Sequence, residues 1–298
     1  MGTLFKKTFI RWMEIDPFGR AAALAYITLF SMAPTLLIVM AVAGWAFDEA
    51  AVKGHLFGEL RGFIGDEAAK ALQIIVEKAA FSGKGTAASL WGVALVVIGA
   101  TGTFTYLKST LNDLWCVKAK PVIGQVKDFF LNRLLSIGML IALGFLMLVS
   151  LAISAALNAF GKGLAWYLAI PEWFLPVINA VWSILFIALV FALVFKVLPD
   201  VHLKWVDVWI GALFTSALFT GGKALIAIYL GQSSVTSVYG AAGSLVILML
   251  WVYYSALILL LGAAFTKAYA DYRNIQVQPT AQAVPVHVKK VLVEDTAA

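Results

Sequence analysis

Long apolar blocks without charged residues alternate along the chain with shorter segments in which Lys, Arg, Asp and Glu gather. A helix needs about 20 apolar residues, each rising about 1.5 Å, to cross a hydrocarbon core of about 30 Å. Segments of that length, with at most one charged residue each, lie at 21–47, 85–107, 134–161, 173–195, 208–230 and 241–266. The pattern predicts an all-α, polytopic membrane protein whose six-helix transmembrane domain covers residues 21–272.

The first 20 residues have a different pattern, in which large apolar side chains interleave with basic ones. They combine Leu4, Phe5, Phe9, Ile10, Trp12 and Met13 with Lys6, Lys7 and Arg11. This mixture is typical of an amphipathic helix that lies in the headgroup layer, so residues 1–20 are predicted to form an interfacial helix. Asp16 and Pro17 are the residue types that start a helix, and they predict a turn into the first span.

Two further segments fall outside the spans. The loop 48–84 is about 37 residues long and repeats apolar residues at helical spacing, which predicts two short amphipathic helices on the outer surface. These helices either cap a cavity or lie on the lipid. The segment 273–298 carries Pro279 and Pro285 and has little apolar content, so a disordered tail is expected there.

Composition agrees with a membrane protein. Apolar residues make up 62% of the 298 positions and charged residues 13%, whereas soluble domains are about 45–50% apolar and about one quarter charged. The side that holds both termini carries fifteen Lys and Arg residues outside the spans, and the opposite side carries six. Since basic residues accumulate on the cytoplasmic side, both termini are predicted to be cytoplasmic and the 48–84 loop periplasmic.

The remaining chemistry argues against several functional classes. The net charge of +6 comes from residues at the ends of apolar blocks, a placement that does not favour a nucleic-acid partner. The single Cys116 cannot form an internal disulfide, and the three histidines lack metal-ligand spacing. No nucleophile with a base and no cluster of acids recurs on one helical face. We expect neither an enzyme nor a metal or cofactor site.

Polar residues inside the spans are the candidate functional residues, because hydrocarbon makes each of them costly. Lys223 lies on one face of the fifth helix with Ser216 and Thr220, beside a second face of small residues. Two interpretations stand for Lys223. It extends to the outer headgroups, or it lines a cavity and attracts an anionic group.

Two other uncharged polar regions are candidates for the same path. The first helix carries Tyr26, Ser31 and Pro34, and the proline produces either a kink that improves packing or one that shapes a substrate site. The segment 231–244 is rich in Ser and Gly without charge, so it forms either a packed turn or part of a solute path. Within it, Tyr239, Gly240 and Gly243 are the pathway candidates.

Three stretches of the chain resemble the YihY/BrkB family of bacterial inner-membrane proteins. They are VYGAAGSLVILMLWVYYSALILLLGAAFTKAYA at 238–270, AAALAYITLFSMAPTLL at 21–37 and ATGTFTYLKSTLNDLW at 100–115. The resemblance ends near residue 272, and Ala264 stands where the family commonly has an acid. It implies a protein of the bacterial inner membrane, with members associated with serum resistance or with movement of osmolytes and ions. Family-pattern residues without an assigned role are Tyr26, Ser31, Pro34, Asn112, Trp115, Tyr239, Gly240, Gly243, Trp251, Tyr254 and Gly262.

Two functions fit these observations. The first is a transporter or exporter of a small polar or charged solute, an osmolyte or ion, through a path bounded by the first, fifth and sixth helices. The second is a lipid-handling or envelope scaffolding protein without an aqueous path. We favour the first because the polar residues cluster on particular helices. Membrane lipids are expected partners of either, and a homo-oligomer is compatible with both.

Overall fold

The structure, a computed structural model, describes residues 2–44, 54, 57–58, 61, 66–82, 102–120, 138, 146, 171, 174–232, 243–275, 277–280 and 283–286. For α2 (Pro17–Gly44), side chains are described as far as Ser31. Most of the predicted spans 134–161 and 85–107 lies outside these residues, as does most of the first half of the 48–84 loop. The fold below concerns the described part of the chain.

The N-terminal segment forms a helix, a tight turn and then α2. Helix α1 (Gly2–Glu14) ends before Asp16, which adopts a positive φ of 51°. The backbone N–H of Gly19 donates to Asp16 Oδ1 at 3.3 Å, and Pro17 is the first residue of α2. Asp16 therefore caps α2, and the proline has no N–H that needs a partner there. The turn predicted at Asp16 and Pro17 is present.

Three long apolar helices follow in the second half of the chain: α7 (Phe174–Val197), α8 (Trp205–Gln232) and α10 (Gly243–Tyr272). Within them, the segments Ala180–Val197, Trp205–Ile226 and Leu245–Tyr272 are long and apolar enough to cross a membrane. They overlap the predicted spans 173–195, 208–230 and 241–266. Helix α10 ends at Tyr272, six residues beyond the predicted end at 266.

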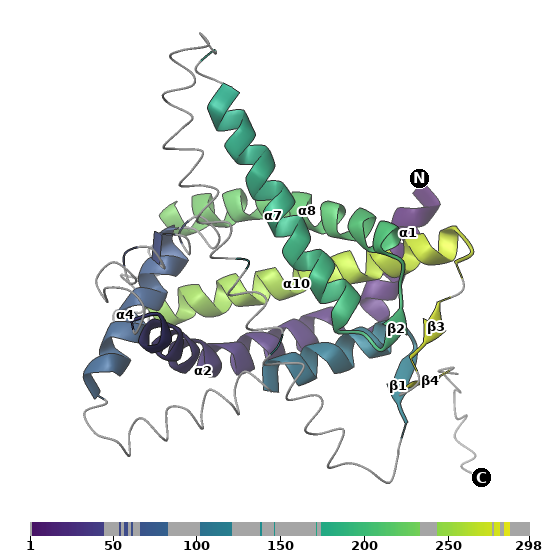
Figure 1. Cartoon of the computed structure of the whole chain (residues 1–298), viewed down its shortest axis with the longest axis horizontal. Helices are drawn as coiled ribbons and strands as arrows, with labels where there is room; N and C mark the ends of the chain where they lie inside the picture. The colour runs from purple at the N-terminus through teal and green to yellow at the C-terminus, as the bar shows by residue number, and fades with distance from the viewer. Residues whose placement is uncertain are drawn as a thin grey trace, which may run out of the picture.

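Helix α10 lies at the centre of the described bundle (Figure 1). It packs against α1, α2, α8 and α4 (Asp66–Ser82), while α7 crosses α8. Helix α4 covers one end of the bundle, and α1 crosses α10 near the opposite end. Helix α4 buries Ala68, Ala69, Leu72 and Val76, so it lies on other helices rather than on lipid alone.

Small residues bring α8 and α10 into close contact. A Cβ added to Gly262 of α10 would overlap Thr215 of α8, and a Cβ added to Gly211 of α8 would overlap Thr266 of α10. Each threonine hydroxyl donates to the glycine carbonyl one turn earlier on its own helix, at 2.6 Å for Thr215 and 2.8 Å for Thr266. Backbones approach closely in this way where lipid removes the hydrophobic drive for helix association.

Four short strands depart from the all-α prediction. Strand β1 (Val117–Ala119) pairs antiparallel with β4 (Ala283–Pro285), and β2 (Val201–His202) pairs antiparallel with β3 (Gln278–Pro279). The prediction of a disordered tail is therefore wrong for the residues in β3 and β4. These strands pair with segments far away along the chain, so local composition carried no signal for them.

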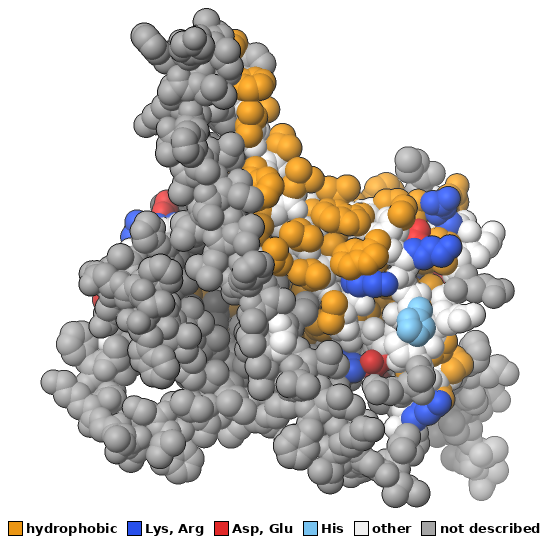
Figure 2. All heavy atoms as spheres, viewed as in Figure 1, with side chains coloured by type: hydrophobic (Ala, Val, Ile, Leu, Met, Phe, Trp, Pro, Cys, Tyr) orange, Lys and Arg blue, Asp and Glu red, His pale blue; other side chains and the backbone are white. Residues whose placement is uncertain are grey.

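Charged side chains are distributed unevenly over the visible face (Figure 2). Apolar side chains cover the middle of this face, along α7 and α8, and Lys, Arg, Asp and Glu gather mainly at the end that holds α1 and the strands. We call this end the charged end. An apolar middle with charges at the ends is the distribution that a bilayer imposes on a spanning protein.

The close packing of α8 on α10 can be tested by comparing alanine substitutions at two glycines, Gly262 and Gly221. Gly262→Ala should lower the free energy of unfolding by about 1–3 kcal/mol, because the new methyl group overlaps the β-branched Thr215 side chain. Gly221→Ala meets no atom within 4 Å and should be neutral or slightly stabilising. Thermal unfolding of both purified variants checks the difference, and equal stability would contradict the close contact.

Candidate functional site

Polar side chains of α8 form the first candidate site. Ser216 is fully buried, and its hydroxyl donates to the carbonyl of Leu213 at 3.0 Å. Thr220 Oγ1 is buried and has no hydrogen-bond partner within the described part of the chain. Lys223, three residues further, is partly buried. We call Ser216, Thr220 and Lys223 the α8 polar face, and polar groups at such depth are functional candidates because burying them in hydrocarbon is costly.

Helix α4 packs next to this face. It contacts α2, α8 and α10, the three helices predicted to bound a solute path. Ala71 of α4 and Ile247 of α10 form a small buried cluster against which Ile226 of α8 packs. Since Ile226 lies three residues beyond Lys223, α4 covers the end of the bundle beside the α8 polar face.

The candidates on α2 lie apart from one another. Tyr26 is 60% exposed, with its ring centroid 5.0 Å from that of Phe30. Ser31 is buried, and its hydroxyl donates to the carbonyl of Thr28 at 2.9 Å. Because α10 packs against both α2 and α8 and lies between them (Figure 1), the described residues of α2 and the α8 polar face do not form one cluster.

Four further candidates are only partly covered by the structure. Helix α2 continues through Pro34 to Gly44, and the side chain of Pro34 lies outside the described residues. Tyr239 and Gly240 also lie outside them. Gly243 is buried at the first residue of α10.

Three family-pattern residues of α10 pack against α8. Trp251 is buried, and its ring meets Phe219 edge to face with centroids 5.7 Å apart. The ring of Tyr254 occupies the space that a Cβ of Gly222 would need. Gly262 meets Thr215 in the contact described above. These residues therefore hold two spans together, a role that explains their residue types without a ligand.

The charged end contains a second group of functional candidates, centred on Asp200. The side-chain amide of Asn112 donates to Asp200 Oδ2 at 2.8 Å, and its carbonyl accepts from the backbone N–H of Asp200 at 2.8 Å. Lys108 Nζ lies 2.9 Å from Asp200 Oδ1. Asn112 thus joins the helical residues 102–114 to the connection between α7 and β2 through two reciprocal hydrogen bonds.

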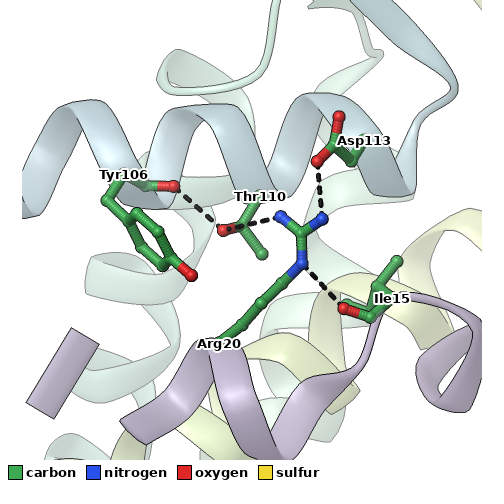
Figure 3. A network of polar contacts seen from close by, with 5 residues as sticks. All are labelled: Ile15, Arg20, Tyr106, Thr110 and Asp113. Carbon is green, nitrogen blue, oxygen red and sulfur yellow. Dashed lines mark hydrogen bonds and ion pairs between the residues drawn. The ribbon is translucent and has the colours of Figure 1, made fainter. Parts of the chain in front are cut away.

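Arg20 makes a similar connection from α2 (Figure 3). Its guanidinium donates to the carbonyl of Ile15 at 2.7 Å and to Thr110 Oγ1 at 3.2 Å, and it pairs with Asp113 Oδ2 at 2.7 Å. The Thr110 hydroxyl donates in turn to the carbonyl of Tyr106 at 2.9 Å. One arginine therefore ties the α1–α2 turn to the end of the helix at 102–114.

Asp271 links α10 to α1 in the same region. Its carboxylate lies 2.7 Å from Arg11 of α1 and 2.8 Å from Lys267, one turn earlier on α10. Lys267 Nζ also lies 5.3 Å from the ring centroid of the buried Trp115. This arrangement of a cation over an aromatic face is favourable, and it places the family-pattern residue Trp115 in the contact between α10 and the end of helix 102–114.

The pairings at the charged end were missed by sequence reasoning. Arg20, Lys108 and Lys267 are among the fifteen basic residues whose distribution predicts the orientation of the chain. The spacing of Lys108 and Asn112 at i and i+4, with Asp200 directly after an apolar block, was the available signal. It indicates a shared helical face but does not identify a partner that lies 88 residues away.

Comparisons with known proteins agree on a membrane-protein family. The family model described as Virulence factor BrkB matches residues 8–286 and so includes β3 and β4. A UPF0761 membrane protein of Verminephrobacter eiseniae is 28% identical over 251 residues, which cover 83% of this chain and 57% of that protein. A UPF0761 membrane protein of Mannheimia succiniciproducens is 27% identical over 282 residues, which cover 92% and 91% of the two chains.

The lengths of these relatives differ. The chain spans little more than half of the V. eiseniae protein and of a similar UPF0761 membrane protein from Albidiferax ferrireducens, of which it covers 56%. No solved structure matches the chain.

The Asn112–Asp200 pair can be tested by exchanging its two side chains. Asn112→Asp places two carboxylates in contact and should lower the free energy of unfolding by about 1–3 kcal/mol. Adding Asp200→Asn restores one amide and one carboxylate, so the double variant should regain most of that stability. Thermal unfolding of the single and double variants measures the recovery. A double variant no more stable than Asn112→Asp would contradict the pairing.

Proposed function

Because the chain belongs to the Virulence factor BrkB family and carries apolar helices long enough to span a membrane, we propose that it transports a small polar or charged solute across the bacterial inner membrane. The solute class is an osmolyte or ion. The path follows the α8 polar face and is bounded by α2, α8 and α10.

One observation carries this proposal. Helix α4 contacts all three helices that bound the path and packs against Ile226, one turn from Lys223. A charged side chain is costly to keep in a span, and it is retained where it serves a solute path or an ion pathway. In this proposal α4 covers the outer side of the path.

The α8 polar face supplies suitable chemistry. Ser216 and Thr220 offer hydroxyl groups, and the ammonium group of Lys223 attracts a carboxylate, a phosphate or an inorganic anion. These groups suit a solute that carries a negative charge or a strong hydrogen-bond acceptor. The activity needs no catalytic residue or cofactor.

The charged end faces the cytoplasm in this proposal, with both termini on that side. The basic residues Lys108, Lys196, Lys204 and Lys267 all lie there, as the positive-inside rule requires. Helix α4 then lies on the periplasmic side.

A second function is favoured by α1. Its side chains Phe5, Phe9, Ile10 and Met13 are about half exposed, a surface suited to acyl chains and headgroups. In this alternative the protein handles lipids or organises the envelope through its lipid-facing surface and has no aqueous path.

A flux assay on protein reconstituted in liposomes separates the two functions. Osmolytes, cations, anions and a labelled phospholipid are compared, and uptake of a small anionic or zwitterionic solute is expected. Movement of the labelled phospholipid without solute uptake would favour the alternative.

Substitution of Lys223 tests the proposed path. Lys223→Ala should lower solute flux by about tenfold or more, since a hydrogen bond to a charged group contributes about 1.5–3 kcal/mol. Lys223→Arg keeps the charge and should retain most of the flux. Leu225→Ala, at a 70% exposed position two residues away, serves as the matched control and should leave flux unchanged. Wild-type flux in Lys223→Ala would remove the α8 polar face from the path.

A further inference from the structure

The C-terminal segment crosses the charged end and pairs with two connections that lie far apart in sequence. We call residues 277–280 and 283–286 the strap. In β4, Ala283, Val284 and Pro285 pair with Ala119, Lys118 and Val117 of β1. In β3, Gln278 and Pro279 pair with His202 and Val201 of β2. The strap therefore binds the segment after helix 102–114 and the connection between α7 and α8 (Figure 1).

Two further backbone hydrogen bonds extend these pairings, and one of them reaches Asp200 in the cluster formed with Asn112 and Lys108. The N–H of Thr280 donates to the carbonyl of Asp200 at 2.9 Å, and the N–H of Val286 donates to the carbonyl of Cys116 at 2.8 Å. Asp200 is the residue held by Asn112 and Lys108. The strap thus contacts the same connection that the side-chain cluster holds.

The strap is also continuous with the central helix. Residues 273–275 turn the chain at the end of α10, where Asn274 has a positive φ of 53° and the N–H of Ile275 donates to the carbonyl of Ala270 at 2.9 Å. Ile275 and Val277 then pack against the main core. A movement of the strap would therefore act on α10, which contacts α1, α2, α4 and α8.

Several of the contacts that close the charged end are individually weak. Both sheets have two strands of two or three residues, and such sheets have little stability of their own. Ala283 is buried, while Gln278 and Pro285 are exposed. The ion pairs Arg11–Asp271 and Arg20–Asp113 are about one third exposed, so each adds at most about 1 kcal/mol. Such a set of contacts can open and close without unfolding the spans.

We propose that the strap is a releasable latch that holds the cytoplasmic ends of helix 102–114, α7, α8 and α10 together. Its release lets these ends separate and opens the inner end of the solute path, while α4 covers the outer end. This inference rests on the proposed transport function, because it identifies the gate of that same path.

The only cysteine of the chain provides a direct way to lock the latch. Cys116 directly precedes β1 and has a positive φ of 56°, and Val286 directly follows β4. The N–H of Val286 donates to the carbonyl of Cys116 at 2.8 Å, so the two backbones are in contact, as a disulfide with its Cα separation of about 4.4–6.8 Å requires. Val286→Cys should therefore form a reversible disulfide with Cys116.

The locked protein is compared with its reduced form in two measurements. Oxidation of Val286→Cys should slow amide exchange of peptides containing β1 and β4 by about tenfold, because strap opening is blocked. It should also lower solute flux in liposomes by about tenfold, and a reductant should restore both. The double variant Val286→Cys with Cys116→Ser cannot form the disulfide and should not respond to oxidation.

The outcomes separate this inference from the transport proposal. A complete disulfide that leaves exchange unchanged would overturn the latch, because the strap would then be static. Slower exchange with unchanged flux would show that the strap opens without gating the path, which also overturns the inference. If wild-type protein moves no solute while oxidation still slows exchange, the transport proposal fails and the releasable strap stands.

Discussion

Hydrocarbon offers no hydrogen-bond partner, so each polar group of a spanning chain must be satisfied within the protein or placed at the membrane surface. The contact between α8 and α10 obeys this constraint, since Thr215 and Thr266, which pack against the facing glycines, return their hydroxyls to carbonyls of their own helices. Most of the described charged side chains meet the constraint by lying where the membrane surface is expected. They gather at one end of the bundle, where Asp113, Asp200 and Asp271 each pair with a base.

Much of the fold followed from local patterns. Apolar length located α7, α8 and α10, and the residue types Asp16 and Pro17 located the first turn, because both features act through neighbours in sequence. The small-residue face of α8 was also visible in the spacing of Gly211, Thr215 and Gly222. The strap was not visible in the sequence, because its short strands find partners only when distant connections meet at one end of the bundle.

The candidate site was predicted less completely than the fold. Their position within an apolar block makes Lys223, Ser216 and Thr220 candidates from sequence, and the structure adds α4, which contacts α8 and packs near Ile226. Trp251, Tyr254 and Gly262 proved to be packing residues between two spans. Asn112 and Trp115 have contacts at the charged end that depend on partners 88 or more residues away, which no periodic pattern reports.

The proposed solute path, the proposed latch and the predicted orientation of the chain all require that the charged end lies at the cytoplasmic surface. The exposed, native Cys116 lies at that end and reports its side directly. A membrane-impermeant thiol reagent should leave Cys116 unmodified in intact cells and modify it in inverted vesicles. Asp66→Cys in a Cys116→Ser background, at the exposed start of α4, should show the reverse. Modification of Cys116 from outside intact cells would contradict the account.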